Sequence, residues 1–264
     1  MTEIRHLQLT ILNIMSDVDE LCRNNDIPYY LIGGSALGAV RHNGFIPWDD
    51  DLDIGMKEAD YRRFVNLAKQ QLDYQKYYVQ EGLVDWPMYF TKIKLKGTYV
   101  KEIGGSSFDD GKSGIFLDVF KLDATPNNCF LQMVQYALAK YFTCYQLAQR
   151  KYHSPSFKKK MMVMLSWPLK ISVLRKYLIK YVDHWNKFDT NYLGFFYTRT
   201  NFKTSIMERQ IYGNPKRVPF ENLQLPIPEY YHEYLTHIFG DYMKLPPVEQ
   251  RQGLHMISVD FGKY

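Results

Sequence analysis

The sequence has few cysteines, and their arrangement predicts neither a disulfide framework nor a metal site. The only three in the 264 residues are Cys22, Cys129 and Cys144, and no two of them form a CxxC pair. An odd number without metal-type spacing argues against a small disulfide-stabilised domain and against a zinc centre. We therefore expect the chain to occupy a reducing compartment.

Long uncharged apolar segments are also missing. No stretch of 18 residues lacks a charge, which argues against a transmembrane helix. The first residues, MTEIRHLQLT, carry charges where a signal peptide has its apolar region. We find no internal repeat and no low-complexity linker, so the sequence predicts one compact unit with a helical insertion.

The charge balance excludes one class of partner and leaves two others open. A formal net charge of +5 and a pI of about 8.8 are only mildly basic. The sequence has no concentrated basic stripe, so we do not expect nucleic-acid binding. An anionic substrate and an anionic membrane surface both fit this charge. The 22 Tyr and 16 Phe suit a cleft for sugars or bases, but they also suit ordinary half-buried positions.

Hydrophobic periodicity predicts an α/β core in residues 1–126. Helical spacing marks residues 2–25 and 57–72, with a shorter helix at 36–42. Strand patterns are expected at 29–32, 52–56 and 115–120, and near 76–81, 88–95 and 98–102. The loop 104–114, rich in Gly, Ser and Asp, is expected to form a mobile flap.

Residues 127–190 change character and predict a helical lobe, and residues 191–264 are expected to return to the core. In that last part we expect short strands at 193–198 and 206–220, then a helix at 229–239 that ends at Gly240. Within the lobe, Lys158–Lys160 precede the run MMVMLSWPLKISVLRKYLIKYV. Basic amphipathic helices of this kind can lie on an anionic membrane or pack as an ordinary helical layer with solvated lysines.

The segment PWDDDLDI, residues 47–54, is the strongest candidate for chemistry. Alternation along a strand would place Asp51 and Asp53 on one face, about 6.6 Å apart, with Leu52 and Ile54 facing the core. Two such carboxylates can share one Mg²⁺ or Mn²⁺ with substrate phosphates. A merely solvated acidic turn fits poorly, because apolar side chains surround the acids and would make unpaired charges costly.

A calcium loop of the EF-hand type is excluded at two positions. Asp49, Asp51 and Asp53 match its first alternating ligands. The required glycine is replaced by Ile54, and the twelfth position is Asp60 where that loop has glutamate.

Asp118 is the candidate for a third carboxylate. It stands alone within the apolar strand IFLDVF, where an acid is costly unless it is used. It can complete the metal site or act as a base toward an acceptor hydroxyl. The alternative is an acid on an edge strand that faces water.

A phosphate-binding end is predicted beside these acids. Gly33, Gly34 and Ser35 lie between an expected strand and an expected helix, where free N–H groups can meet a phosphate. Further positive charge can come from the residues that follow and from a later strand, namely Arg41, His42, Lys92 and Lys94. A tight turn alone also favours glycine, and surface lysines are usually only solvated.

The stretch LIGGSALGAVRHNGFIPWDDDLDIGM resembles the LicD/fukutin-related family of phosphotransferases, which have a nucleotidyltransferase-like fold. The pieces KIKLKGTYV and IFLDVFKLD are also similar to it. So is the tail PFENLQLPIPEYYHEYLTHIFGDYMKLPP, with Arg251 and His255 after it. The similarity is weakest over 127–190. The resemblance implies an α+β fold, a mixed sheet with flanking helices and a helical insertion lobe.

The resemblance also implies a glycine–serine turn followed by a metal site. Asp51 and Asp53 match the family's metal ligands, and Asp118 matches its third carboxylate. The turn reads GGS where relatives often have GT or YGT. Further site residues are expected among Trp48, Asp49, Asp50 and His255, although a structural role fits His255 better than that of a base.

The implied reaction is the transfer of phosphocholine, or of a related phospho-alditol, from a CDP-linked donor to a sugar hydroxyl. The acceptor would be a lipid-linked precursor of teichoic acid or lipopolysaccharide, and the enzyme would be cytoplasmic, at the inner face of the membrane. Two alternatives remain at this stage: a nucleotidyltransferase that moves the nucleotide itself, and a non-catalytic glycan-binding relative.

Overall fold

A computed structural model describes residues 2–102, 114–149, 157–197, 200–251, 253 and 256–264. Its centre is a mixed sheet in the order β1-β2-β6-β4-β3, which β7 and β8 extend from β6. The strands are β1 (Tyr30–Leu31), β2 (Asp53–Lys57), β3 (Tyr77–Gln80), β4 (Thr91–Leu95), β6 (Phe116–Thr125), β7 (Tyr192–Gly194) and β8 (Ile206–Glu208). This confirms an α+β fold of the nucleotidyltransferase-like type.

Strand β6 lies at the middle of the sheet and is buried along its whole length. It pairs in parallel with β2 and antiparallel with β4. Two register pairs matter for the site: Asp53 faces Asp118 across β2 and β6, and Lys92 faces Asp118 across β4 and β6. Partners in register share one face of a sheet, so these three side chains form one row across three strands.

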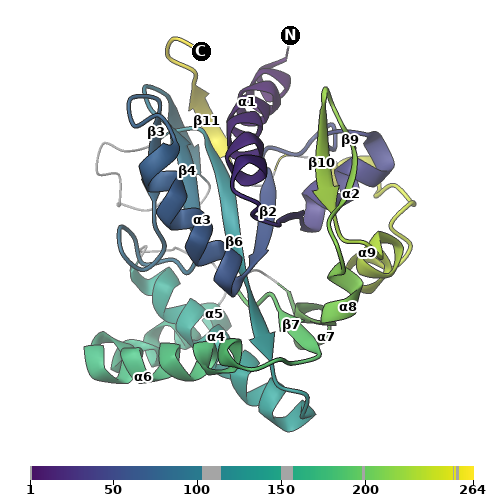
Figure 1. The fold of residues 1–264 in the computed structure, drawn as a ribbon. Coiled ribbons are helices and arrows are strands. Elements are labelled where there is room, and N and C mark those ends of the chain that lie inside the picture. Colours follow the sequence, from purple (N-terminus) through teal and green to yellow (C-terminus); the bar gives the residue numbers. More distant parts are fainter. Residues whose placement is uncertain (1, 103–113, 150–156, 198–199, 252, 254–255) are drawn as a thin grey trace.

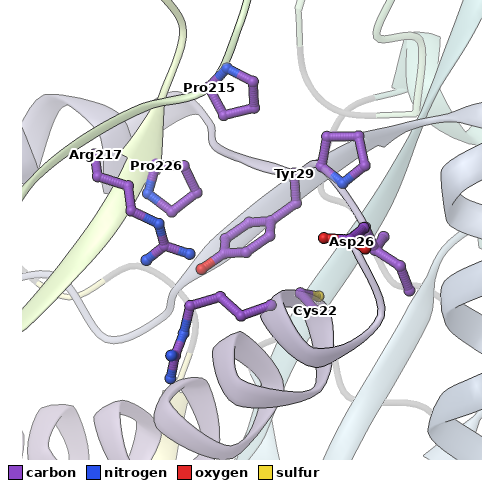
Figure 2. Close-up of a pocket in the computed structure, with 9 residues that line it drawn as sticks. Cys22, Asp26, Tyr29, Pro215, Arg217 and Pro226 are labelled. Carbon is purple, nitrogen blue, oxygen red and sulfur yellow. The ribbon is translucent and has the colours of Figure 1, made fainter.

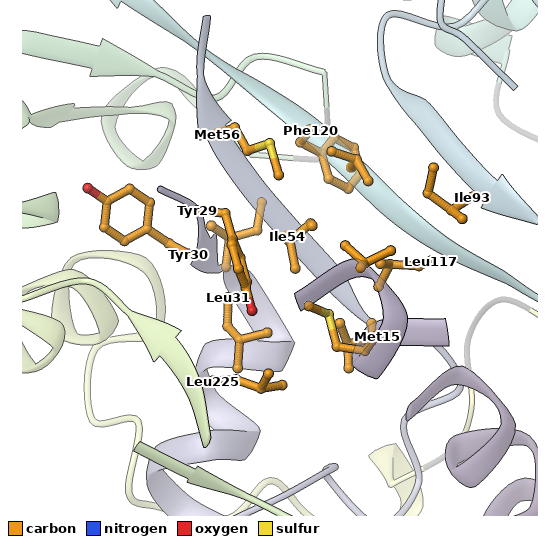
Figure 3. Packing of buried hydrophobic residues seen from close by; sticks show 14 of the residues in the cluster. Met15, Tyr29, Tyr30, Leu31, Ile54, Met56, Ile93, Leu117, Phe120 and Leu225 are labelled. Atoms are coloured by element: carbon orange, nitrogen blue, oxygen red, sulfur yellow. The ribbon is translucent and has the colours of Figure 1, made fainter. Parts of the chain in front are cut away.

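Helix α1 (Glu3–Asn24) and helix α3 (Glu58–Gln71) contact each other and cover the same part of the sheet (Figure 1). Helical spacing in α1 produces this contact, since its apolar residues recur every three or four positions along one side. Met15 packs near Ile54 of β2 and Leu117 of β6 (Figure 3). Burying one such side chain contributes about 1.5–3 kcal/mol. The helices predicted for 2–25 and 57–72 are confirmed.

The helical lobe follows the C-terminal end of β6 and lies at the bottom of Figure 1. It consists of α4 (Cys129–Gln149), α5 (Phe157–Leu165), η1 (Trp167–Lys170), α6 (Ser172–Asp183) and η2 (His184–Lys187). Its apolar residues form a second cluster around Phe142, which also holds Tyr89 and Phe196. The helical character predicted for 127–190 is confirmed, whereas the exact domain limits at 126 and 190 stay a prediction.

A buried charge cluster joins the lobe to the sheet. Lys121 Nζ lies 2.8 Å from Asp123 Oδ1 and 2.6 Å from Asp183 Oδ1 of α6. The hydroxyl of Tyr89 donates a hydrogen bond to Asp183 as well. Burial raises the pKa of Asp123 to about 6, against the lowering effect of Lys121. Because buried charges are tolerated only when paired, this cluster fixes the orientation of α6 on the sheet.

In the C-terminal part, the predicted strand range 206–220 contains two strands and a short helix, whereas two further strands were not predicted. Strand β9 (Lys216–Phe220) forms a hairpin with β10 (Leu223–Ile227), and β11 (Met256–Asp260) pairs with β5 (Tyr99–Glu102). The short helices are α7 (Phe202–Ser205), α8 (Arg209–Tyr212) and η3 (Val248–Gln250). Helix α9 (Tyr231–Phe239) ends at Gly240, whose φ is +68°, as predicted.

Three local expectations differ from the structure or fall outside it. Helix α2 (Gly33–His42) begins three residues before the predicted 36, so the glycines form its first turn. Strand β2 begins at Asp53, so Asp51 lies in the loop before it. The expected flap at 104–114 falls almost entirely on residues outside the described ranges.

Candidate active site

The row of Asp53, Asp118 and Lys92 forms the floor of the site. Lys92 is only 2% exposed, and its Nζ lies 3.1 Å from Asp118 Oδ1. The rings of Trp86, Phe90 and Phe116 lie around the ammonium. Aromatic faces stabilise a cation. Lys92 therefore compensates one carboxylate of the row from within the core instead of reaching outward toward a ligand.

Asp118 is buried at the middle of the sheet, between β2 and β4. The alternative of an edge-strand acid that faces water is therefore wrong. The prediction that Asp118 lies beside the acidic segment is correct, because β2 and β6 pair in parallel from Asp53 onward and Asp118 N–H donates to the carbonyl of Leu52.

The acidic loop that precedes β2 gathers further carboxylates. One oxygen from each of Asp49, Asp50 and Asp51 lies within 4.8 Å of the others. The sequence pattern predicted Asp51 and Asp53 on one face of a strand. Strand alternation does not bring these carboxylates together, because pairing with β6 starts only at Asp53. Asp51 lies in the loop before β2. A turn at Pro47 and Trp48, in which Asp49 N–H donates to the carbonyl of Ile46, leads into this loop.

Crowding changes the protonation of this group. Burial, followed by the charges of Asp51 and Asp50, raises the pKa of Asp49 to about 8. Burial also raises the pKa of Asp53 well above its ordinary value, helped by Asp51, Asp118 and Asp49, while Lys92 opposes the shift. Like charges this close cannot all ionise unless a cation joins them. The donor set, hard carboxylate oxygens, fits Mg²⁺ or Mn²⁺.

The first turn of α2 lies directly against the acidic loop. Ser35 Oγ accepts a hydrogen bond of 2.8 Å from Asp53 N–H, which joins the helix to β2. A Cβ atom at Gly34 would stand 3.0 Å from Asp49 Oδ2. Gly33 has φ +55° and its N–H donates to the hydroxyl of Tyr234. The turn and the acids predicted from sequence are therefore brought together.

Arg41 and His42, at the end of α2, belong to a basic and aromatic group beside the loop. Arg41 donates to the carbonyl of Tyr242 at 2.8 Å and to His42 Nε2 at 3.0 Å. Burial and the charge of Arg41 lower the pKa of His42. The ring of His42 meets Trp48 edge-on, and Arg251 lies over the same Trp48, 5.6 Å from its centroid. Trp48 thus joins two basic groups to the acidic loop.

Asp50 differs from its neighbours because it holds the C-terminal segment. It is buried, and its Oδ2 accepts a hydrogen bond of 2.9 Å from Met256 N–H at the start of β11. A Cβ at Gly253 would lie 3.1 Å from the same oxygen. Sequence reasoning missed Tyr242, Gly253 and Met256, because their contacts are made by backbone groups with no side-chain signature.

The remaining predicted residues are less central. Lys94 is half-buried and lies on the same face of β4 as Lys92, opposite Phe116 and farther from Asp118. His255 lies outside the described residues. The pocket in Figure 2, of about 310 Å³, lies elsewhere, near the end of α1, where Arg217 pairs with Asp19 at 2.7 Å. It contains none of the predicted site residues.

The sequence is similar to those of known proteins. Residues 26–134 match the family model described as LicD/FKTN/FKRP, nucleotidyltransferase domain. The chain is 30% identical to "Lipopolysaccharide cholinephosphotransferase LicD" of Haemophilus influenzae over 96% of both chains. It is 53% identical to "Ribitol 5-phosphate transferase FKRP" of Homo sapiens over 34 residues, which are 13% of this chain and 7% of that protein. The chain therefore belongs to the LicD family and is a phosphotransferase.

Proposed function

We propose that the protein transfers phosphocholine, or a related phospho-alditol group, from a CDP-linked donor to a sugar hydroxyl of a teichoic acid or lipopolysaccharide precursor. The observation that carries the proposal is the convergence of Asp49, Asp51, Asp53 and Asp118 beside the first turn of α2. The cholinephosphotransferase of Haemophilus influenzae, similar along nearly its whole length, supports phosphocholine as the group moved. The ribitol 5-phosphate transferase supports a phospho-alditol as the other candidate.

A divalent cation, Mg²⁺ or Mn²⁺, is part of this proposal. Asp51, Asp53 and Asp118 would hold it, with Asp49 beside them. The raised pKa values of Asp49 and Asp53 support this assignment, because a cation would offset the burial and the mutual repulsion that cause them. Once bound, such an ion neutralises charge on the phosphate oxygens of a donor.

The protein's own groups have separate tasks in the proposed reaction. The N–H groups of the first turn of α2 receive the donor phosphates, since a helix N-terminus favours anions. Ser35 keeps this turn on β2, and Lys92 holds Asp118 in place from the core side. Arg41 and Arg251 supply positive charge next to Trp48, which suits the anionic donor.

Identification of the product tests the proposal. Purified protein is incubated with CDP-choline, CDP-ribitol or CDP-glycerol, Mg²⁺ and a soluble acceptor oligosaccharide. Release of CMP with a phospho-group on the acceptor supports the proposal. Release of pyrophosphate from CTP would instead identify a nucleotidyltransferase, and glycan binding without turnover of any donor would identify a binding protein. The intact set of acids argues against that last outcome.

The place of the reaction follows from its substrates. Nucleotide-linked donors are made in the cytoplasm, and lipid-linked acceptors are built at the inner leaflet. We therefore place the enzyme in the cytoplasm, at the inner face of the membrane. Among the residues that the structure describes, no helix is long and apolar enough to cross a bilayer.

A further inference from the structure

The outer side of the helical lobe exposes many large apolar side chains. They lie on α5, η1 and α6 and the linker between them, and each is 42–67% exposed. We call this set the lobe surface: Met161, Met162, Met164, Leu165, Trp167, Ile171, Val173, Leu174 and Tyr177. Many large apolar side chains exposed on consecutive elements indicate an interaction site.

Packing of the lobe does not need these residues. The inner side of η1 and α6 is already filled, because Leu169 and Val182 are buried in one cluster with Phe142 of α4. Helix α4 contacts both α5 and α6 from that side. An ordinary helical layer with solvated lysines, one of the two interpretations of this sequence, explains the inner side but leaves the exposed apolar residues without a role.

The charges that follow the lobe surface along the chain are positive, and the one acid of α5, η1 and α6, Asp183, is paired with Lys121. From Ala124 to Val182 the sequence contains ten lysines and arginines and no acidic residue. Lys160, Lys170, Lys176 and Lys180 are exposed. In α6, Val173, Lys176, Tyr177 and Lys180 follow helical spacing and so share one side, with apolar groups flanked by lysines.

We propose that the lobe surface is a membrane-docking site for anionic phospholipid, in which α5, η1 and α6 lie in the plane of the interface. Apolar side chains beside lysines, with Trp167 among them, are the composition that binds at the headgroup boundary. The lysines match the charge of anionic headgroups. A second copy of the chain is a poor occupant, because a two-fold interface would face these cations with the same cations.

The lobe surface lies far from the acidic cluster. The carboxylates lie at the N-terminal ends of β2 and β6, whereas the lobe follows the C-terminal end of β6 (Figure 1). From Asp118 to Thr125 the strand alone extends about 23 Å. Docking and chemistry are therefore separable, and this inference does not depend on which group the enzyme transfers.

Flotation with vesicles tests the docking site. The full chain is mixed with vesicles of phosphatidylcholine alone or with added phosphatidylglycerol, and the bound fraction is measured at low and high salt. We expect binding only to the anionic vesicles, and weaker binding at high salt. The triple variant Lys170→Glu, Lys176→Glu, Lys180→Glu should bind at least about a hundredfold more weakly, since each lysine near the surface contributes about 1 kcal/mol. Trp167→Ala should weaken binding as well.

A matched triple variant gives the control. Lys216→Glu, Lys244→Glu and Lys263→Glu change the net charge equally but lie outside the lobe. Tyr74→Ala removes an exposed aromatic ring elsewhere. These variants should bind like the parent protein, and all variants should keep activity on a soluble acceptor. Equal loss of binding in both triple variants, or no binding by the parent, overturns the proposal. So does a concentration-dependent dimer in sedimentation that only the lobe variants abolish.

Discussion

Lys92 and Asp118 form a buried ion pair across β4 and β6, with Nζ 3.1 Å from Oδ1 and the lysine almost fully removed from water. Through the parallel pairing of β6 and β2, the same Asp118 also lies in register with Asp53. A buried cation, Lys92, thus compensates part of the negative charge of Asp118 and Asp53, which lie next to the acidic loop. Removing one partner of this pair and removing both should therefore have different effects on stability.

Replacing Lys92 with methionine should destabilise the fold strongly. Asp118 would keep a buried charge without its partner, which costs about 3–5 kcal/mol. Urea unfolding followed by circular dichroism measures this change. The double variant Lys92→Met, Asp118→Asn removes both charges and should recover most of the stability, yet remain inactive. Lys94→Met, on the same strand but only half-buried, should change stability little. A Lys92→Met protein as stable as its parent would contradict the pairing.

Asp51→Asn should abolish turnover while leaving the fold intact. This residue lies in a loop outside the sheet ladder, so its removal disturbs no strand pairing. As a proposed metal ligand, its loss should reduce activity by more than about a hundredfold. It should also abolish the rise in Tm that Mg²⁺ or Mn²⁺ gives the parent protein. Asp26→Asn is the matched control on the exposed turn after α1. Full activity in Asp51→Asn would exclude this residue as a ligand.

The acidic loop should make stability depend on pH when divalent cations are removed with EDTA. Asp49 has a pKa of about 8 in the folded protein and about 3.8 when unfolded. Between these values the folded state holds a proton that the unfolded chain has lost. The stabilising contribution of this group is therefore complete below about pH 3.8, falls as pH rises from there, and is lost once pH passes about 8. Asp49→Asn should therefore reduce the fall in Tm between pH 5 and pH 8. An identical fall in parent and variant would contradict the assigned shift.

Gly33 and Gly34 should tolerate alanine differently. At Gly33 the space for a methyl group is open but φ is +55°, so Gly33→Ala should cost about 1 kcal/mol of stability and keep most activity. At Gly34 the added methyl would lie 3.0 Å from the Asp49 carboxylate. Gly34→Ala should therefore reduce kcat more than stability. Steady-state kinetics measures kcat and thermal unfolding measures stability for both variants. Equal losses of kcat in the two variants would contradict this prediction.

Local patterns predicted the elements whose periodicity is strong. The helical spacing of α1 predicted a helix with one buried face, and the apolar run of β6 predicted a strand that is buried along its whole length. The glycine turn and the acidic segment were also found, since both are unusual residue types close together in the chain. Their convergence with Asp118 was expected and the structure confirms it, although the role of each side chain stays a proposal.

Other features depend on contacts between distant segments. The pairing of Lys92 with Asp118 depends on the register between β4 and β6, which no local spacing encodes, so Lys92 was expected to face the donor. Asp51 was assigned to a strand because alternation cannot tell where pairing begins. Strand β11, near the C-terminus, pairs with β5, which lies much earlier in the chain, and its sequence MISVD has no turn signal to mark it. In each of these cases the structure is determined by pairing between strands that are distant in the sequence.

Asp50 connects this missed strand to the site, and its substitution tests that connection. Its carboxylate accepts a hydrogen bond from the backbone N–H of Met256, so Asp50→Ala leaves this donor without its acceptor at the start of β11. Loss of a buried charged hydrogen bond costs about 1.5–3 kcal/mol. Hydrogen exchange should therefore accelerate at Val259 and Val100, which pair across β11 and β5, while amides of β2 and β6 stay protected. Activity should fall less than in Asp51→Asn, because Asp50 acts as an anchor for the C-terminal segment. Unchanged exchange at Val259 would show that β11 is held by its pairing with β5 alone.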